Sequence, residues 1–128
     1  MKDREKEYRE IFIAEALQEY DDLSRHIVEL EKSPKDDKLL SEIFRLLHNL
    51  KANARAVGYD HISDLAHQLE SIFSIIRKNE VVFEGALITI LLDSFDYLGL
   101  LLNNLEDPNY KTLDPRIVSS LADIIENT

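Results

Sequence analysis

Two histidines, a lysine and a glutamate carry the chemistry that this sequence offers. His48 and Lys51 lie three residues apart in one amphipathic stretch, and His67 and Glu70 lie three residues apart in the next. A carboxylate that accepts the Nδ1–H of an imidazole fixes the tautomer and leaves the Nε2 lone pair free to attack an electrophile. A lysine beside that nitrogen would neutralise charge on an arriving phosphoryl group, because phosphoryl transfer depends mostly on positioning and electrostatic stabilisation.

The apolar residues around His48 recur at helical spacing, which predicts that the histidine lies on the outside of a helix. The residues of this stripe are Ile43, Leu46, Leu47, Leu50, Ala54 and Val57. A core histidine would fall within the stripe, whereas His48 falls on the opposite surface. Glu70 flanks the buried face of the following stretch, and a short turn at Gly58 could bring that edge against His48.

Two other interpretations of these four residues stay open from spacing alone. All four could be solvated surface residues, since a polar histidine on a helix is common and His-x-x-Glu has little specificity. A metal site is the second, because His67-x-x-Glu70 reverses the Glu-x-x-His pair of di-iron bundles. Those sites need inward glutamates from two further helices, and the fourth helical segment offers only Glu84, near its start.

The remaining segments indicate a helical framework for these residues. Only three glycines and three prolines occur in 128 residues, which leaves little punctuation for a sheet. Apolar residues recur at helical spacing in five segments, about 8–32, 37–57, 60–78, 84–105 and 114–127. Because the links are short, we predict an all-α fold in a single domain of residues 1–128. It is an antiparallel four-helix up-and-down bundle over about 8–106, with a fifth, C-terminal helix packed against it.

Charge and composition narrow the class of function. The formal net charge of −10 argues against a nucleic-acid partner, and the absence of cysteine excludes disulfides and thiolate metal sites. Residues 1–7 are charged where a leader would turn apolar, and the uninterrupted apolar runs are far shorter than the ~20 residues that span a bilayer. We therefore expect a soluble, cytoplasmic protein, with no membrane partner, that is monomeric as an isolated domain.

The motif around His48 resembles the signature of histidine phosphotransfer (HPt) domains. That signature, H-x-[IL]-K-G-x-A followed by G-[FY], is similar to residues 48–54 (HNLKANA) and 58–59 (GY). The similarity begins at residues 11–16 (IFIAEA) and includes residues 67–70 (HQLE), so it covers at least 11–80. The chain is most similar to the N-terminal phosphotransfer domain of the CheA family of chemotaxis sensor kinases.

The resemblance implies a role for each of the four polar residues. His48 would be phosphorylated on Nε2, Glu70 would accept its Nδ1–H, and Lys51 and His67 would complete the polar network. The donor would be an ATP-dependent histidine kinase catalytic domain, and the acceptor an aspartate of a response-regulator receiver domain. ATP and Mg²⁺ would belong to those partners, so this chain would need no cofactor. The alternative is a degenerate HPt bundle that acts only as a docking or scaffold module.

Three residues near His48 are candidates for a partner surface. The family's usual glycine after the lysine is Ala52 here, and Arg55 replaces a small residue on the same helix face as His48. Phe44 lies one turn before His48, where an exposed aromatic is unusual unless a partner docks there or a neighbouring helix covers it. We expect Phe44, Ala52 and Arg55 to contact partner proteins.

Overall fold

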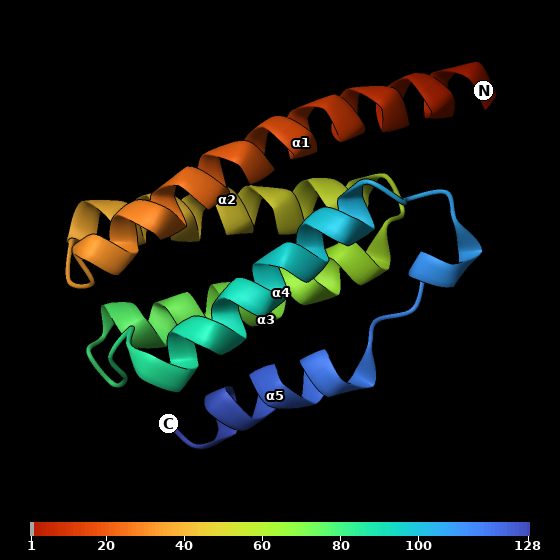
Figure 1. The fold of residues 1–128 in the computed structure, drawn as a ribbon. Helices are drawn as coiled ribbons and strands as arrows, with labels where there is room; N and C mark the ends of the chain where they lie inside the picture. Colours follow the sequence, from red (N-terminus) through yellow and green to blue (C-terminus); the bar gives the residue numbers. More distant parts are fainter. Residues whose placement is uncertain (1) are drawn as a thin grey trace.

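The computed structural model describes residues 2–128, and helices account for most of them (Figure 1). The helices are α1 (Lys2–Lys32), α2 (Asp37–Ala56), α3 (Asp60–Arg77), α4 (Gly85–Leu102) and α5 (Pro115–Glu126), with a short 3-10 helix at Pro108–Tyr110. No strand occurs within the described residues. Met1, which opens the charged segment noted above, lies outside them. The all-α prediction is confirmed.

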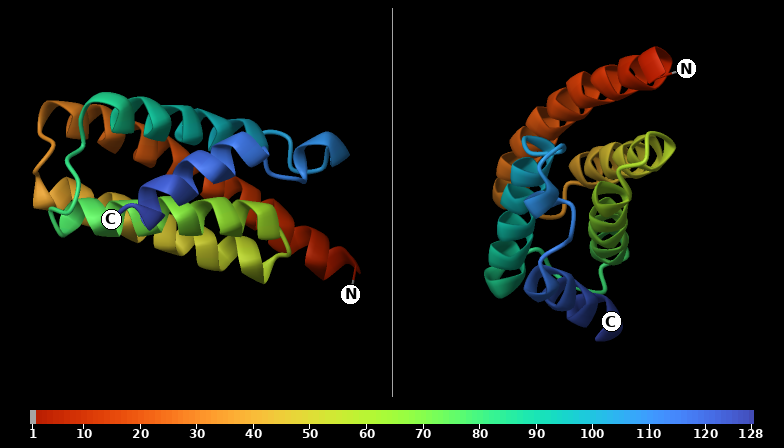
Figure 2. Two further views of the ribbon diagram at one scale, coloured as in Figure 1. Left: turned by 90° about the horizontal axis from the view of Figure 1, so that it is seen from below. Right: turned by 90° about the vertical axis from the view of Figure 1, so that its right-hand side faces the viewer.

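Helices α1 to α4 form the predicted up-and-down bundle. Successive helices run in opposite directions, and the right-hand view of Figure 2 shows α1 and α4 on one side with α2 and α3 on the other. Contacts join α1 to α2, α2 to α3, α3 to α4 and α4 back to α1, and α5 packs against α3 and α4. The predicted C-terminal helix docked on a four-helix bundle is therefore confirmed.

The pairing of α2 with α3 is set by two apolar stripes and a tight turn. The stripes are buried along both helices, at Leu40, Ile43, Leu46, Leu47, Leu50 and Ala54 and at Ile62, Leu65, Leu69, Ile72, Phe73 and Ile76. Each leucine, isoleucine and phenylalanine among them contributes roughly 1.5–3 kcal/mol when buried, so the two helices are firmly held against each other.

The turn between α2 and α3 depends on Gly58, as predicted. Gly58 has a φ of +86°, and the N–H of Tyr59 donates to the carbonyl of Ala54 at 2.9 Å. This is the glycine-closed helix end in which a left-handed residue satisfies the last carbonyls of the helix. The chain reverses within residues 57–59, and α3 returns directly along α2.

Two helix boundaries differ from the sequence prediction. Helix α1 begins at Lys2 rather than near Tyr8, because residues 4–7 are strong helix formers and Asp3 suits the first turn, although none of them belongs to an apolar stripe. Figures 1 and 2 show this end of α1 projecting beyond the bundle. Helix α4 ends at Leu102 rather than Leu105, and Leu105 is nonetheless buried.

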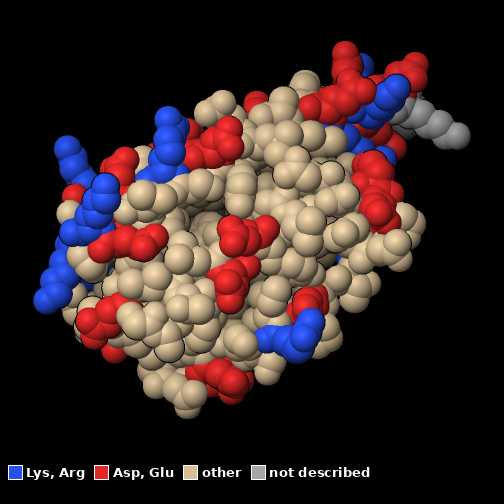
Figure 3. Space-filling model, in the orientation of Figure 1, with Lys and Arg blue, Asp and Glu red and all other residues tan. Residues whose placement is uncertain are grey.

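The face formed by α1, α4 and α5 has few charges at its centre. Figure 3 shows that face in the orientation of Figure 1: most of it is uncharged, a small cluster of acidic side chains lies near its middle, and the basic side chains lie toward its margins. Within residues 2–128, α4 is the one helix whose length and apolar composition would suffice to cross a bilayer. It packs against α1, α3 and α5, and Leu91, Leu98 and Leu101 on it are fully buried.

Candidate functional site

The side chains of His48 and Glu70 meet on the outer edge of the α2–α3 pair. Nδ1 of His48 lies 2.6 Å from Oε2 of Glu70, and Nζ of Lys51 donates to Oε1 of the same carboxylate at 2.8 Å. The apolar stripes and the Gly58 turn bring these residues together across two helices. The contact that the sequence suggested between His48 and Glu70 is present.

The three side chains differ greatly in exposure. The His48 side chain is 57% exposed, whereas Lys51 is 25% and Glu70 only 9% exposed. An ionised carboxylate only accepts hydrogen bonds, so in the neutral imidazole Nδ1 carries the hydrogen of this contact. Nε2 then keeps its lone pair on a ring that is open to solvent.

The electrostatics of the site keep Glu70 ionised. Burial by itself raises the pKa of the Glu70 carboxyl. The hydrogen bonds from Lys51 and His48, together with the charges of those groups, outweigh burial and hold this pKa below its ordinary value of 4.5. At neutral pH the carboxylate is therefore a charged acceptor for both partners.

Ser63 is a supporting residue to which sequence reasoning gave no role. Its hydroxyl is buried and donates to the backbone carbonyl of Lys51 at 3.0 Å. This bond ties α3 to α2 beside the site, since the carbonyl belongs to the residue that contacts Glu70. The available signal was a small polar residue at the edge of the buried stripe of α3.

His67 is near the site in sequence but does not join its hydrogen bonds. It lies one turn before Glu70 and is exposed. Within residues 2–128, its side chain makes no hydrogen bond to His48, Lys51 or Glu70, and the two oxygens of Glu70 accept from His48 and Lys51. The polar network that the family resemblance implied thus contains His48, Lys51 and Glu70 in this structure, with His67 beside it.

The three candidate partner residues lie in different surroundings. Ala52 and Arg55 are exposed on α2, whereas Phe44 is half-buried. The guanidinium carbon of Arg77, at the end of α3, lies 5.7 Å from the centre of the Phe44 ring. A neighbouring helix therefore covers part of Phe44, which was one of the two interpretations left open. Sequence reasoning missed Arg77, although it follows Glu70 by seven residues and so shares its helix face.

The metal interpretation finds no matching geometry. Across residues 2–128, no three histidine, aspartate or glutamate side chains converge as metal ligands would. Glu84, the one glutamate that the fourth segment offered, is exposed and precedes the first residue of α4.

Comparisons with known proteins agree with the site and the fold. A family model described as the Hpt domain matches residues 7–107. The chemotaxis protein CheA of Bacillus subtilis (strain 168) is 28% identical over 118 residues, which cover 92% of this chain and 18% of that protein. The chain therefore spans less than a fifth of the length of this curated relative.

Solved structures show the same architecture. A solution structure of the histidine phosphotransfer domain of CheA superimposes with a TM-score of 0.81 at 27% identity, covering 95% of this chain and 91% of that one. The phosphorylated P1 domain of CheA3, solved in complex with CheY6 from R. sphaeroides, shares the fold with a TM-score of 0.73 at 21% identity. That match covers 94% of each chain.

Proposed function

Because the chain belongs to the Hpt domain family, we propose that it is a phosphocarrier in chemotaxis-type two-component signalling. His48 accepts a phosphoryl group from an ATP-dependent histidine kinase catalytic domain and passes it to an aspartate of a receiver domain. The observation that carries this proposal is the 2.6 Å contact between the buried Glu70 carboxylate and Nδ1 of the exposed imidazole.

The contact with Glu70 suits both steps of the transfer. In the first step the Nε2 lone pair attacks the γ-phosphorus of ATP, an N–P bond forms, the bond to the β-phosphate oxygen breaks, and ADP leaves. The ring then carries positive charge, which the Glu70 carboxylate stabilises through the Nδ1–H. In the second step an aspartate oxygen of the receiver attacks phosphorus, the N–P bond breaks, and the neutral imidazole returns.

Lys51 supplies positive charge beside the reacting nitrogen. An ammonium group has three donors, and the contact with Glu70 at 2.8 Å uses one of them. The others remain for phosphoryl oxygens on Nε2, so Lys51 neutralises charge that develops during transfer. His67, exposed one turn before Glu70, is a further candidate donor to the same oxygens.

Partner domains would approach the exposed surface around His48. Ala52 and Arg55 are exposed on the same helix, and part of Phe44 remains accessible beside them. A receiver partner is supported by the shared fold with CheA3 P1, which was solved in complex with CheY6. In this proposal ATP and Mg²⁺ are held by the kinase and receiver domains. The chain acts in the cytoplasm and is monomeric as an isolated domain.

Radiolabelling tests the proposal directly. With a CheA-type kinase catalytic domain and γ-labelled ATP, the wild-type chain should take up one acid-labile, base-stable phosphoryl group. His48→Gln should take up none and keep its fold by circular dichroism, since the side chain is exposed. His26→Gln and His61→Gln are controls that should retain the label. Stoichiometric label on His48→Gln would overturn the assignment.

A further inference from the structure

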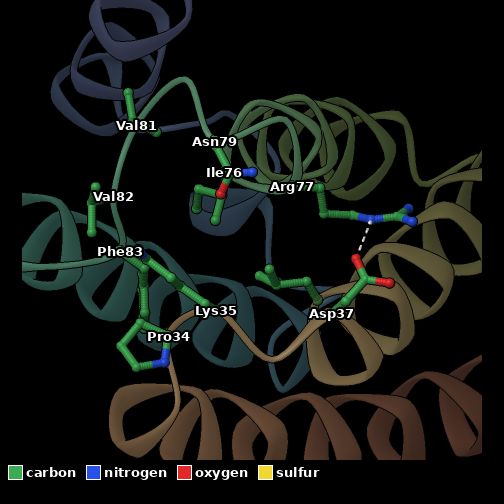
Figure 4. Close-up of a pocket in the computed structure, with 10 residues that line it drawn as sticks. Pro34, Lys35, Asp37, Ile76, Arg77, Asn79, Val81, Val82 and Phe83 are labelled. Atoms are coloured by element: carbon green, nitrogen blue, oxygen red, sulfur yellow. Dashed lines mark ion pairs between the residues drawn. The ribbon is translucent and has the colours of Figure 1, made fainter.

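Four side chains form a row along the outer edge of the α2–α3 pair. Asp37, Phe44 and His48 follow one another along α2, and Arg77 joins them from the last turn of α3. Nε of Arg77 lies 3.9 Å from Oδ1 of Asp37, and its guanidinium lies over the Phe44 ring. Figure 4 shows Arg77 reaching from α3 toward Asp37 on α2. The side chain of Arg77 thus bridges two residues of the helix that carries the histidine.

The Phe44 ring in turn stacks with the imidazole of His48. The two planes differ by 13° and the ring centres are 6.5 Å apart, within the range of offset-stacked aromatic pairs. Phe44 is half-buried and contacts Arg77, whereas the His48 side chain is 57% exposed. The phenyl ring is therefore the less exposed of the two rings.

The imidazole needs a second restraint besides Glu70. The hydrogen bond at Nδ1 and the bond from Cγ to Cβ set the mean direction of the ring. A side chain that is 57% exposed still tilts about its two torsion angles. Such a tilt turns the Nε2 lone pair away from the phosphorus that it must attack. Displacement of a reacting group by about 1 Å can cost on the order of 100-fold in rate. A flat ring stacked beside the imidazole limits this tilt.

We propose that Arg77 and Phe44 are positioning residues for phosphotransfer at His48. Arg77 restrains the Phe44 ring, and that ring restrains the imidazole so that Nε2 keeps its direction. The proposal rests on the proposed function of His48. It adds that Arg77, on α3, helps to hold the imidazole in place through Phe44. Arg77 touches neither the imidazole nor the phosphoryl group in this scheme, so its effect passes through Phe44.

Kinetics of phosphorylation by the kinase domain separate positioning from docking. Arg77→Gln should lower kcat about two- to fivefold, the loss expected from one exposed cation–π contact, and leave KM unchanged. Arg77→Lys, which keeps the cation, should recover part of that loss. Lys78→Gln is the matched control, because Lys78 is exposed and carries the same charge at the same end of α3.

NMR of the unphosphorylated chain gives a readout that needs no kinase. Phe44→Leu removes the aromatic ring while keeping apolar bulk, so the ring-current shifts of the His48 carbon-bound protons should disappear. Arg77→Gln should reduce the same shifts, and Lys78→Gln should leave them unchanged. Phe44→Leu should also lower kcat by about two- to tenfold, as expected for loss of an aromatic pair.

The outcomes distinguish this proposal from the proposed function. A raised KM with unchanged imidazole shifts in Arg77→Gln would make Arg77 a docking cation and overturn the positioning role. Unchanged kcat and unchanged shifts would overturn it as well. If the wild-type chain takes no label at His48, the proposed function fails, and the NMR shifts still decide whether Arg77 and Phe44 restrain the imidazole.

Discussion

The interface between α2 and α3 differs from the one between α1 and α4 in what lies at its edge. Along α2 and α3 the edge carries the Glu70 carboxylate, which lies 2.6 Å from His48 and 2.8 Å from Lys51. The same edge carries Arg77 over the ring of Phe44. Between α1 and α4 the Tyr20 hydroxyl donates to the backbone carbonyl of Phe95 at 2.9 Å, and Gly99 leaves room for the Tyr20 ring. The first interface thus presents reactive groups to solvent, and the second brings two helices close together.

This difference predicts that substitutions at the two interfaces separate activity from stability. At the α2–α3 edge His48 and Lys51 are at least partly exposed, and Glu70→Gln keeps the shape of the buried side chain and one acceptor oxygen. Changing these groups should therefore cost little folding free energy. Side chains between α1 and α4 pack closely against the opposite helix, as Tyr20 does against Gly99. Changing them should cost stability and leave the rate of phosphorylation of the folded protein unchanged.

The largest effect is expected for Glu70→Gln. The amide oxygen can still accept the Nδ1–H of His48 but carries no charge to stabilise the phosphorylated ring. Phosphorylation should slow about 10–100-fold, at the weaker end of what acid–base partners contribute. The free energy of unfolding should fall by only about 0.5–1.5 kcal/mol, because the amide oxygen still accepts one of the two hydrogen bonds. Rapid-quench kinetics and urea unfolding measure the two quantities.

Glu42→Gln is the matched control for Glu70→Gln. Glu42 also pairs with a cation, Arg45, but neither side chain takes part in the hydrogen bonds among His48, Lys51 and Glu70. Its substitution should change neither the phosphorylation rate nor the His48 tautomer reported by ¹⁵N shifts. Equal rates for Glu70→Gln and wild type would show that the carboxylate does not assist transfer, and the contrast between the two interfaces would fail.

Gly99→Ala should lower the free energy of unfolding and leave the phosphorylation rate unchanged, whereas Glu70→Gln should act mainly on that rate. A Cβ at this position would lie 2.5 Å from the Tyr20 ring, which cannot swing away without losing its hydrogen bond to Phe95. Overpacking costs about 1–3 kcal/mol, and the higher helix propensity of alanine returns about 1 kcal/mol. The free energy of unfolding measured in urea should therefore fall by roughly 1 kcal/mol. The phosphorylation rate of the folded chain should be unchanged.

A second substitution tests the cause of that loss. Tyr20→Leu removes the ring that the new methyl group would strike, so adding Gly99→Ala to it should be neutral or stabilising. A Gly99→Ala penalty of the same size in both backgrounds would mean that the two residues do not interact.

The sequence predicted most of the framework and the central contact of the site. The period of the apolar residues gave the five helices, Gly58 gave the turn, and the angular position of Glu70 placed it against His48. The start of α1 was missed because residues 3–7 are helical without an apolar stripe to mark them.

Contacts that depend on side-chain conformation across two helices could not be predicted. The position of Arg77 over Phe44 depends on the path of a long side chain, which periodicity does not report. The absence of His67 from the hydrogen bonds to Glu70 depends on the conformation of an exposed side chain. The contact between Gly99 and Tyr20 depends on how closely α1 approaches α4.

The smallest expected effect is the pH dependence of stability that Glu70 adds. Its pKa is held below 4.5 in the folded chain, chiefly by the Lys51 and His48 hydrogen bonds acting against burial, whereas the unfolded chain titrates near 4.5. The unfolded state therefore binds the proton first as pH falls, and stability declines on that side. The stabilising contribution of Glu70 is fully present above the unfolded pKa and is lost as pH falls through the folded pKa.

Comparison of wild type with Glu70→Gln isolates this contribution, since every other acidic group is common to both chains. Their difference in free energy of unfolding should be fully present near pH 5 and should shrink progressively below about pH 4.5. Urea unfolding at half-unit steps of pH measures it. A difference that grew on acidification would mean that the carboxylate is protonated more easily in the folded chain. Burial would then outweigh its two partners, and the charged edge of the α2–α3 interface would be absent.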